Sequence, residues 1–128
     1  MTKFYSLFIF FFGILNCIDQ KTGTFETSGI YEEKITVVRK KNFEVWSFKN
    51  SKRKVKYDIK WLDDCSYISY NRKVIKGKDD VSDLDLGGDV SLDTLYNRIK
   101  NQDKRSFTLS ISVPKYHYSN SMIFEKIK

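Results

Sequence analysis

The chain has 128 residues, a formal net charge of +7 at pH 7 and a hydrophobic fraction of 41%. This length allows one domain with a single core, and an aromatic fraction of 16% with only one proline excludes a disordered chain. Two cysteines and one histidine are too few for a metal site built on His and Cys clusters. These numbers predict one folded, basic domain.

The beginning of the chain is typical of an export signal. Lys3 is the only charged residue before Cys17, and an uncharged apolar run extends from Phe4 to Leu15. This run is shorter than the roughly 20 residues that a helix needs to cross a bilayer. We therefore expect residues 1–16 to form a signal helix that is removed after export, with an uncleaved membrane anchor as the alternative.

The residues around Cys17 indicate how the signal is processed. Ile14-Leu15-Asn16-Cys17 resembles a lipobox, whose cysteine receives a diacylglyceryl group on its sulfur. Asn16 departs from the Gly, Ala or Ser that is usual before that cysteine, which lowers the expected efficiency of processing. We expect lipidation of Cys17, a lipidated tether over residues 17–21 and one β-rich domain over 22–128. The acyl chains would anchor the exported protein to the bacterial cell envelope, in a leaflet that the sequence does not specify.

Cys65, the second cysteine, has two alternative fates. If Cys17 is acylated, Cys65 has no partner within the chain and is expected to be a small buried hydrophobic residue. If Cys17 is not acylated, the two residues can form a disulfide in an oxidising compartment. The two fates exclude each other, because both use the sulfur atom of Cys17.

Most of the mature chain alternates apolar and polar residues, as half-buried strands do. The alternation is clearest over 55–61 and 107–113, and short polar links near 40–42 and 49–51 are typical of hairpins. We expect a mainly β fold, an antiparallel meander or a small half-barrel of about 6–8 strands with one short helix. Weaker strands are expected over 21–27, 34–40, 43–48, 65–70 and 121–127.

The short helix is expected to begin at the end of an acidic segment, residues 79–93, which carries aspartates and no basic residue. From Leu92, apolar residues recur at positions i, i+3, i+4 and i+7, which predicts one apolar helix face. Ser91 can cap the helix, and Lys100 lies near its end, where the helix dipole favours a cation. We expect this helix to pack against the sheet or to close one end of a barrel.

Three short motifs carry a resemblance to a known group of proteins. They are Lys21-x-Gly-x-Phe25, Val37-Val38-Arg39 and Trp61-x-x-x-Cys65-x-Tyr67. Together they resemble small cell-envelope lipoproteins of flavobacteria (Bacteroidota), a group of unknown function. The resemblance implies an antiparallel meander behind a lipid anchor, and it supplies no catalytic residues.

Gly23-x-Phe25 is also similar to the Gly-x-Trp motif in the first strand of lipocalin-like barrels. In those barrels the glycine allows a close approach of the backbone, and the aromatic residue plugs the barrel floor. A plain strand glycine beside a core phenylalanine is the alternative.

Basic residues are concentrated between 39 and 60, close to a strand with an unusual pattern. The strand at 43–48 has apolar residues on both faces, so one face is available for a ligand, a partner or the membrane surface. In an exported protein such a region favours an anionic envelope component or a protein partner over nucleic acid, and a solvated sheet face is the alternative. The candidate binding surface comprises Trp46, Phe48, Lys52, Arg53 and Lys54.

The sequence contains no catalytic motif and implies no cofactor. His117, between two tyrosines, is expected to be a surface or hydrogen-bonded residue, and no Gly-x-Ser-x-Gly elbow is present. Asp83, Asp85 and Asp89 partly match a calcium-binding loop, but the twelfth position holds Thr94 instead of a bidentate Glu. Weak calcium binding is therefore a minor hypothesis beside a solvated acidic loop.

These observations favour a small exported lipoprotein without enzymatic activity, acting as an interaction or accessory module of the envelope. The alternative is a lipocalin-like binder of a small apolar ligand. A closed sheet around a sizeable apolar cavity would favour the binder, whereas a filled core would favour the module.

Overall fold

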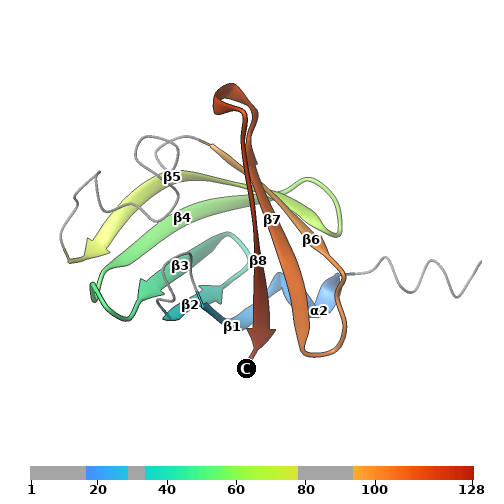
Figure 1. Ribbon diagram of the computed structural model, residues 1–128, viewed down its shortest axis with the longest axis horizontal. Coiled ribbons are helices and arrows are strands. Elements are labelled where there is room, and N and C mark those ends of the chain that lie inside the picture. The colour runs from blue at the N-terminus through green and yellow to red at the C-terminus, as the bar shows by residue number, and fades with distance from the viewer. Residues whose placement is uncertain (1–16, 29–33, 78–93) are drawn as a thin grey trace, which may run out of the picture.

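The computed structural model describes residues 17–28, 34–77 and 94–128, so the signal segment 1–16 lies outside the described residues. The described strands form one closed antiparallel barrel, in which each strand pairs with the next and β8 pairs with β1 (Figure 1). The strands are β1 (Gly23–Ser28), β2 (Lys34–Arg39), β3 (Phe43–Phe48), β4 (Lys54–Trp61), β5 (Ser66–Lys76), β6 (Leu95–Lys100), β7 (Ser106–Val113) and β8 (Tyr118–Lys126). The mainly β, antiparallel fold expected from the sequence is confirmed, and the barrel is closed.

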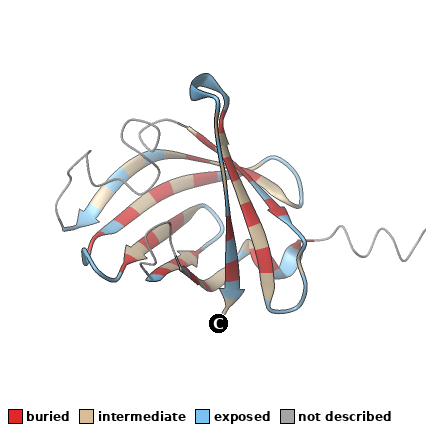
Figure 2. Cartoon of the chain, viewed as in Figure 1, coloured by how far each residue is buried: buried red, intermediate tan, exposed pale blue. Residues whose placement is uncertain are grey.

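Alternation along the strands places one face of the sheet in the barrel interior (Figure 2). Aromatic rings fill much of this interior. Phe107 meets Phe25 edge-on, with 5.2 Å between the ring centroids, and stacks on Phe124 at 5.5 Å. Trp46 meets Phe124 edge-on at 5.9 Å. The core is therefore packed with side chains from strands that are distant in the sequence.

The helix expected from residue 91 to residue 100 is wrong where the structure describes it, because Leu95–Lys100 is strand β6. Leu95 and Ile99 are buried, and a spacing of four residues suits one face of a strand as well as one face of a helix. Asn97 lies between them on the same inward face, where its amide donates to Ser69 Oγ at 2.7 Å. A buried polar residue at that position hid the strand alternation.

The short helix that the structure describes lies elsewhere, at α2 (Ile18–Lys21), within the segment expected as a lipidated tether. Cys17 and Gln20 are buried against the barrel, so this segment is part of the folded domain. Within the described part of the chain, no helix is long and apolar enough to cross a membrane. A second helical turn, η3 (Pro114–Tyr116), connects β7 to β8.

The two ends of the barrel carry different elements, and we call them the helix end and the hairpin end. The helix end carries α2 and the beginning of β1, and the hairpin end carries the β3–β4 hairpin at residues 49–53. Gly23 begins β1 at the helix end with φ of +137°, and a Cβ there would lie 2.7 Å from the carbonyl oxygen of Lys128. Phe25 is fully buried two residues later. The close backbone approach and the buried aromatic expected from Gly-x-Phe are both confirmed.

Candidate functional site

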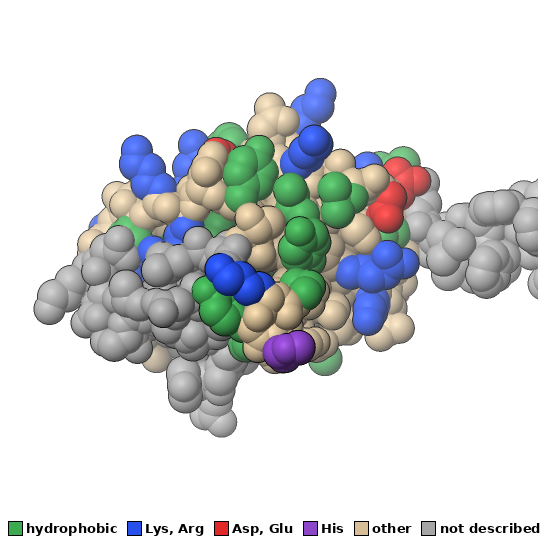
Figure 3. All heavy atoms as spheres, turned by 90° about the horizontal axis from the view of Figure 1, so that it is seen from above, with side chains coloured by type: hydrophobic (Ala, Val, Ile, Leu, Met, Phe, Trp, Pro, Cys, Tyr) green, Lys and Arg blue, Asp and Glu red, His purple; other side chains and the backbone are tan. Residues whose placement is uncertain are grey.

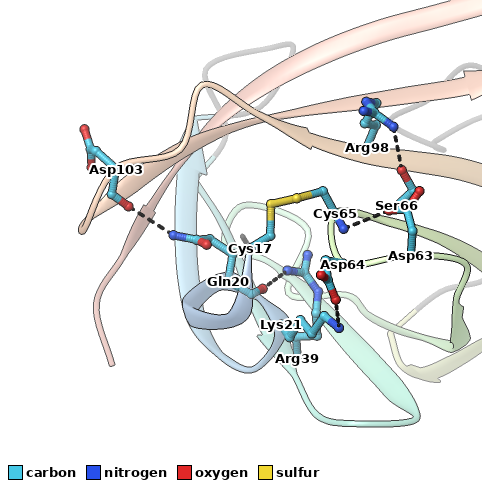
Figure 4. The surroundings of a disulfide bond; sticks show 10 residues. All are labelled: Cys17, Gln20, Lys21, Arg39, Asp63, Asp64, Cys65, Ser66, Arg98 and Asp103. Atoms are coloured by element: carbon cyan, nitrogen blue, oxygen red, sulfur yellow. Dashed lines mark hydrogen bonds and ion pairs between the residues drawn. A yellow bond between two sulfur atoms is a disulfide. The ribbon is translucent and has the colours of Figure 1, made fainter. Parts of the chain in front are cut away.

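A disulfide between Cys17 and Cys65 fastens α2 to the loop between β4 and β5 (Figure 4). The two Cα atoms are 5.2 Å apart, and Cys17 is completely buried. Of the two fates expected for Cys65, the structure therefore holds the disulfide. A sulfur atom in a disulfide cannot carry a thioether, so the structure holds the alternative to lipidation of Cys17.

Polar contacts fix α2 on several sides. The side-chain amide of Gln20 donates to the carbonyl oxygen of Asp103 at 3.0 Å, and Lys126 Nζ donates to the carbonyl oxygen of Asp19 at 2.5 Å. Lys21 Nζ lies 3.4 Å from Asp64 Oδ1. These contacts join α2 to β8, to the β6–β7 turn and to the loop that holds Cys65, so the helix closes this end of the barrel.

Arg39 lies beneath α2 as a fully buried cation with several partners. It donates from Nη1 to the carbonyl oxygen of Gln20 and from Nη2 to Tyr67 Oη, both at 2.7 Å. Its guanidinium carbon lies 4.9 Å from the ring centroid of Phe25 and 4.8 Å from that of Tyr67. Burial raises the pKa of Tyr67 well above its usual value, so this phenol stays neutral.

Glu44 is the buried anion that faces Arg39. Its Oε2 lies 3.9 Å from Arg39 Nη2 and accepts a hydrogen bond from Trp46 Nε1 at 2.8 Å. The sequence of 43–48 has apolar residues on both faces, and the inward set in the structure is Glu44, Trp46 and Phe48. Trp46 is therefore a core residue, whereas the other four residues of the candidate binding surface line the pocket described next.

At the hairpin end, four strands contribute to a pocket of about 260 Å³. It contains Phe48, Lys52, Arg53 and Lys54, which are four of the five residues predicted as a binding surface. Six of its lining residues are basic, and none of the described residues that line it is acidic. We call this site the basic pocket; it is lined by Lys34, Thr36, Ser47, Phe48, Lys49, Lys52, Arg53, Lys54 and Lys76.

Arg53 is the most buried cation of the basic pocket, with only 3% of its surface exposed. Its guanidinium carbon lies 5.0 Å from the ring centroid of Phe48. Gly77, which follows β5 with φ of +92°, allows the chain to pass close by, because a Cβ there would lie 3.0 Å from the Cα of Arg53. The backbone at Gly77 therefore packs directly against Arg53 at the edge of the barrel interior.

The lysines of the basic pocket come from strands that the register brings together. Lys54 and Lys76 are directly opposite each other on β4 and β5, and Ser47 lies opposite Lys54 on the other side. Lys34 forms an ion pair with Glu26 at 3.2 Å. The cluster around residues 49–54 was visible in the sequence, whereas Lys34 and Lys76 join it only through strand pairing.

A second pocket of about 460 Å³ lies beside the β1–β8 seam, and its charges are mixed. Glu26, Glu125 and Asp103 line it together with Lys34 and Arg105. Because its lining contains both cations and carboxylates, this pocket does not favour a ligand of one charge sign. It is a weaker candidate site than the basic pocket.

The outer surface also exposes apolar side chains. Figure 3 shows one face of the molecule, with hydrophobic side chains along its middle and Lys and Arg side chains around them. Tyr96 on β6 and Ile123 on β8 are among the large hydrophobic residues that the structure exposes, Ile123 by 70%. Single exposed apolar residues are normal on soluble proteins, so they carry less weight than a pocket.

Of the remaining candidates from the sequence, the structure describes His117 but not the three aspartates of the calcium-like loop. His117 is exposed in the left-handed conformation at the end of η3, which confirms its expected surface position. Asp83, Asp85 and Asp89 lie outside the described residues. Among the residues that are described, no three His, Cys, Asp or Glu side chains gather in a way that could hold a metal ion.

Comparison with known proteins does not identify the chain. No protein-family model, no curated protein and no solved structure matches it. Its function is therefore inferred from the geometry of its own barrel, and the resemblance to flavobacterial lipoproteins stays a prediction.

Proposed function

We propose that this chain is an exported, non-enzymatic binding protein, a small lipocalin-like barrel that receives a ligand at its hairpin end. The basic pocket is the observation that carries the proposal. It joins a buried cation, Arg53, and an aromatic ring, Phe48, to lysines from three strands and the β3–β4 hairpin around one concave site. Concave sites with a few well-placed polar groups are where small ligands bind.

The barrel interior argues against a purely apolar ligand. Aromatic rings fill much of it, and the buried pair Arg39 and Glu44 lies near the helix end, on the adjacent strands β2 and β3. A ligand with a charged group at the hairpin end fits this arrangement better than the apolar ligand expected from the sequence. The closed barrel is compatible with a binder, whereas the filled interior is what the sequence analysis expected of an interaction module. We therefore propose the basic pocket, and not the interior, as the binding site.

The disulfide supports export, because disulfides persist in oxidising compartments outside the cytoplasm. An anchored state with a lipid on Cys17 is the competing proposal. Intact-mass analysis of the exported protein separates the two: we expect a chain that lacks two hydrogens relative to its reduced form and bears no acyl group. A mature species with a diacylglyceryl group on Cys17 would show that the anchored state is the biological one.

Titration of the oxidised protein with small probes, followed by amide NMR, tests the binding function. The probes are oleate, inorganic pyrophosphate and anilinonaphthalene sulfonate. We expect at least one of them to shift amide signals in β3, β4 and the end of β5, around the basic pocket. Absence of binding by all three, or shifts confined to the outer faces of β6 and β8, would overturn the proposed binding function.

A further inference from the structure

We propose that the helix end is the surface through which this protein docks on an anionic lipid bilayer. Three large apolar side chains are exposed there, Ile18 by 62%, Leu62 by 58% and Ile127 by 49%. They lie on α2, on the loop between β4 and β5, and on the segment after β8. The disulfide fastens that loop to α2, and Lys126 fastens the segment after β8 to it (Figure 4). The three side chains therefore belong to one end of the fold and are not scattered over its surface.

The chain that precedes α2 indicates what covers this surface. Residues 1–16 contain the apolar run from Phe4 to Leu15, which the sequence analysis expects to enter a membrane, and they join the domain at Cys17. A lipid on Cys17 would start from the same place. Because Cys17 is completely buried, no linker separates this attachment point from the folded domain. An export signal, a retained anchor or a lipid would each bring the helix end against the bilayer.

The turns at the helix end carry exposed cations. Lys40 and Lys41 lie in the turn between β2 and β3, and Lys104 lies in the turn between β6 and β7. None of these three lysines forms an ion pair within the described part of the chain. The segments 29–33 and 78–93, which are not described, follow β1 and β5 at the opposite ends of those strands. The connections at the helix end are thus all described.

Three carboxylates at the helix end are held by groups of the protein itself. Asp64 Oδ1 lies 3.4 Å from Lys21 Nζ. Asp63 Oδ1 and Asp103 Oδ1 accept hydrogen bonds from backbone N–H groups of their own turns, at 2.9 and 2.8 Å. These backbone donors partly offset the negative charge of both carboxylates. The lysines of the neighbouring turns have no such partners, so they are available to lipid phosphates.

A bilayer fits these features better than a second copy of the chain does. Apolar side chains on separate loops can enter the boundary between headgroups and acyl chains, while lysines beside them meet anionic lipids. Two copies that met through their helix ends would bring the lysines of both chains together, which like-charge repulsion opposes. Docking in this way also fixes an orientation, in which the basic pocket at the hairpin end faces away from the membrane.

The test uses the oxidised chain as it is recovered after export, mixed with bicelles of phosphatidylcholine and phosphatidylglycerol that contain a spin-labelled lipid. We expect the amide signals of 18–21, 62–64 and 127–128 to broaden most. In sedimentation with vesicles of the same two lipids, Ile18→Ser/Leu62→Ser should bind about tenfold more weakly, because two apolar side chains are lost from the contact. Lys40→Gln/Lys41→Gln should bind several-fold more weakly and respond less to salt.

Matched controls come from exposed residues away from the helix end. Ile75→Ser removes an apolar side chain that is 48% exposed near the other end of β5, and Lys73→Gln/Lys115→Gln removes two exposed lysines from β5 and η3. These variants should keep the vesicle affinity of the unmodified protein. Equal losses in the controls would show that binding follows overall hydrophobicity or net charge, and the proposal would be wrong.

Other outcomes would also overturn docking through the helix end. They are no binding to anionic vesicles, the strongest broadening at the hairpin end, or a dimer in solution that Ile18→Ser/Leu62→Ser dissociates. The last result would make a second copy the partner of this surface. None of them depends on the titrations with small probes, so failure of membrane docking would leave the proposed ligand site at the hairpin end intact.

Discussion

The two ends of the barrel differ in how their charged side chains are arranged. At the helix end, Arg39 is buried among a carbonyl oxygen, a phenol and the carboxylate of Glu44, and Lys21 pairs with Asp64. At the hairpin end, cations crowd into a pocket whose described lining contains no carboxylate. The contacts of the helix end stabilise the fold, whereas the hairpin end is the proposed ligand site, so substitutions at the two ends should have different consequences.

The largest effect is expected from Arg39→Met. This substitution leaves the carboxylate of Glu44 buried without a cation, and breaking a buried ion pair costs about 3–5 kcal/mol. Urea unfolding of the oxidised variant and of the unmodified protein measures the loss. The double variant Arg39→Met/Glu44→Leu should recover part of it, because no lone charge remains. A single variant as stable as the unmodified protein would contradict the structural role of this pair.

Removal of the disulfide should have the next largest effect. The bond joins residues separated by 48 positions, and the closure of such a loop stabilises a fold by about 2–4 kcal/mol. Cys17→Ser/Cys65→Ser should therefore melt at a lower temperature, and a reductant should destabilise the unmodified protein but not the variant. The comparison of the two ends also predicts that the folded variant keeps its affinity for the probe that binds at the hairpin end. A parallel loss of affinity would show that the two ends are coupled.

The buried phenol of Tyr57 should make the free energy of unfolding depend on pH in the alkaline range. Burial raises its pKa from 10.0 to about 12, against the opposing effect of Arg72. The folded state therefore holds the phenol proton more tightly than the unfolded state, and this stabilisation is complete below pH 10. It is lost as the pH rises through about 12. Unfolding measured across this range should show the loss, and Tyr57→Phe should reduce its pH dependence; an unchanged slope would contradict it.

Most of the fold could be predicted because its strands alternate strictly. The predicted ranges 55–61 and 107–113 correspond to β4 and β7 within one residue at each end. Strand β6 was missed because Leu95 and Ile99 fit both periodicities, and because Asn97 turns inward to partners on another strand. Local spacing carries no information about such partners.

The candidate site was predictable only where it is local in sequence. Lys52, Arg53 and Lys54 share one hairpin, and their position could be predicted from the basic cluster. Lys76 lies opposite Lys54 only because of the β4–β5 register, which no spacing rule reveals. The disulfide was one of two open outcomes, since the distance between Cys17 and Cys65 depends on how α2 packs.

The smallest predicted effect tests the hairpin end most directly. Lys54→Gln removes one of two like charges that face each other across β4 and β5, so it should stabilise the ligand-free protein by about 0.2–1 kcal/mol. Lys100→Gln, an exposed control opposite Thr108, should leave stability nearly unchanged. Urea unfolding at low ionic strength measures both, and added salt should reduce the difference. A stabilising effect of Lys54→Gln means that the unmodified chain tolerates repulsion at the very place where an anion would relieve it. A destabilising effect would instead make Lys54 a structural residue and remove the contrast between the two ends.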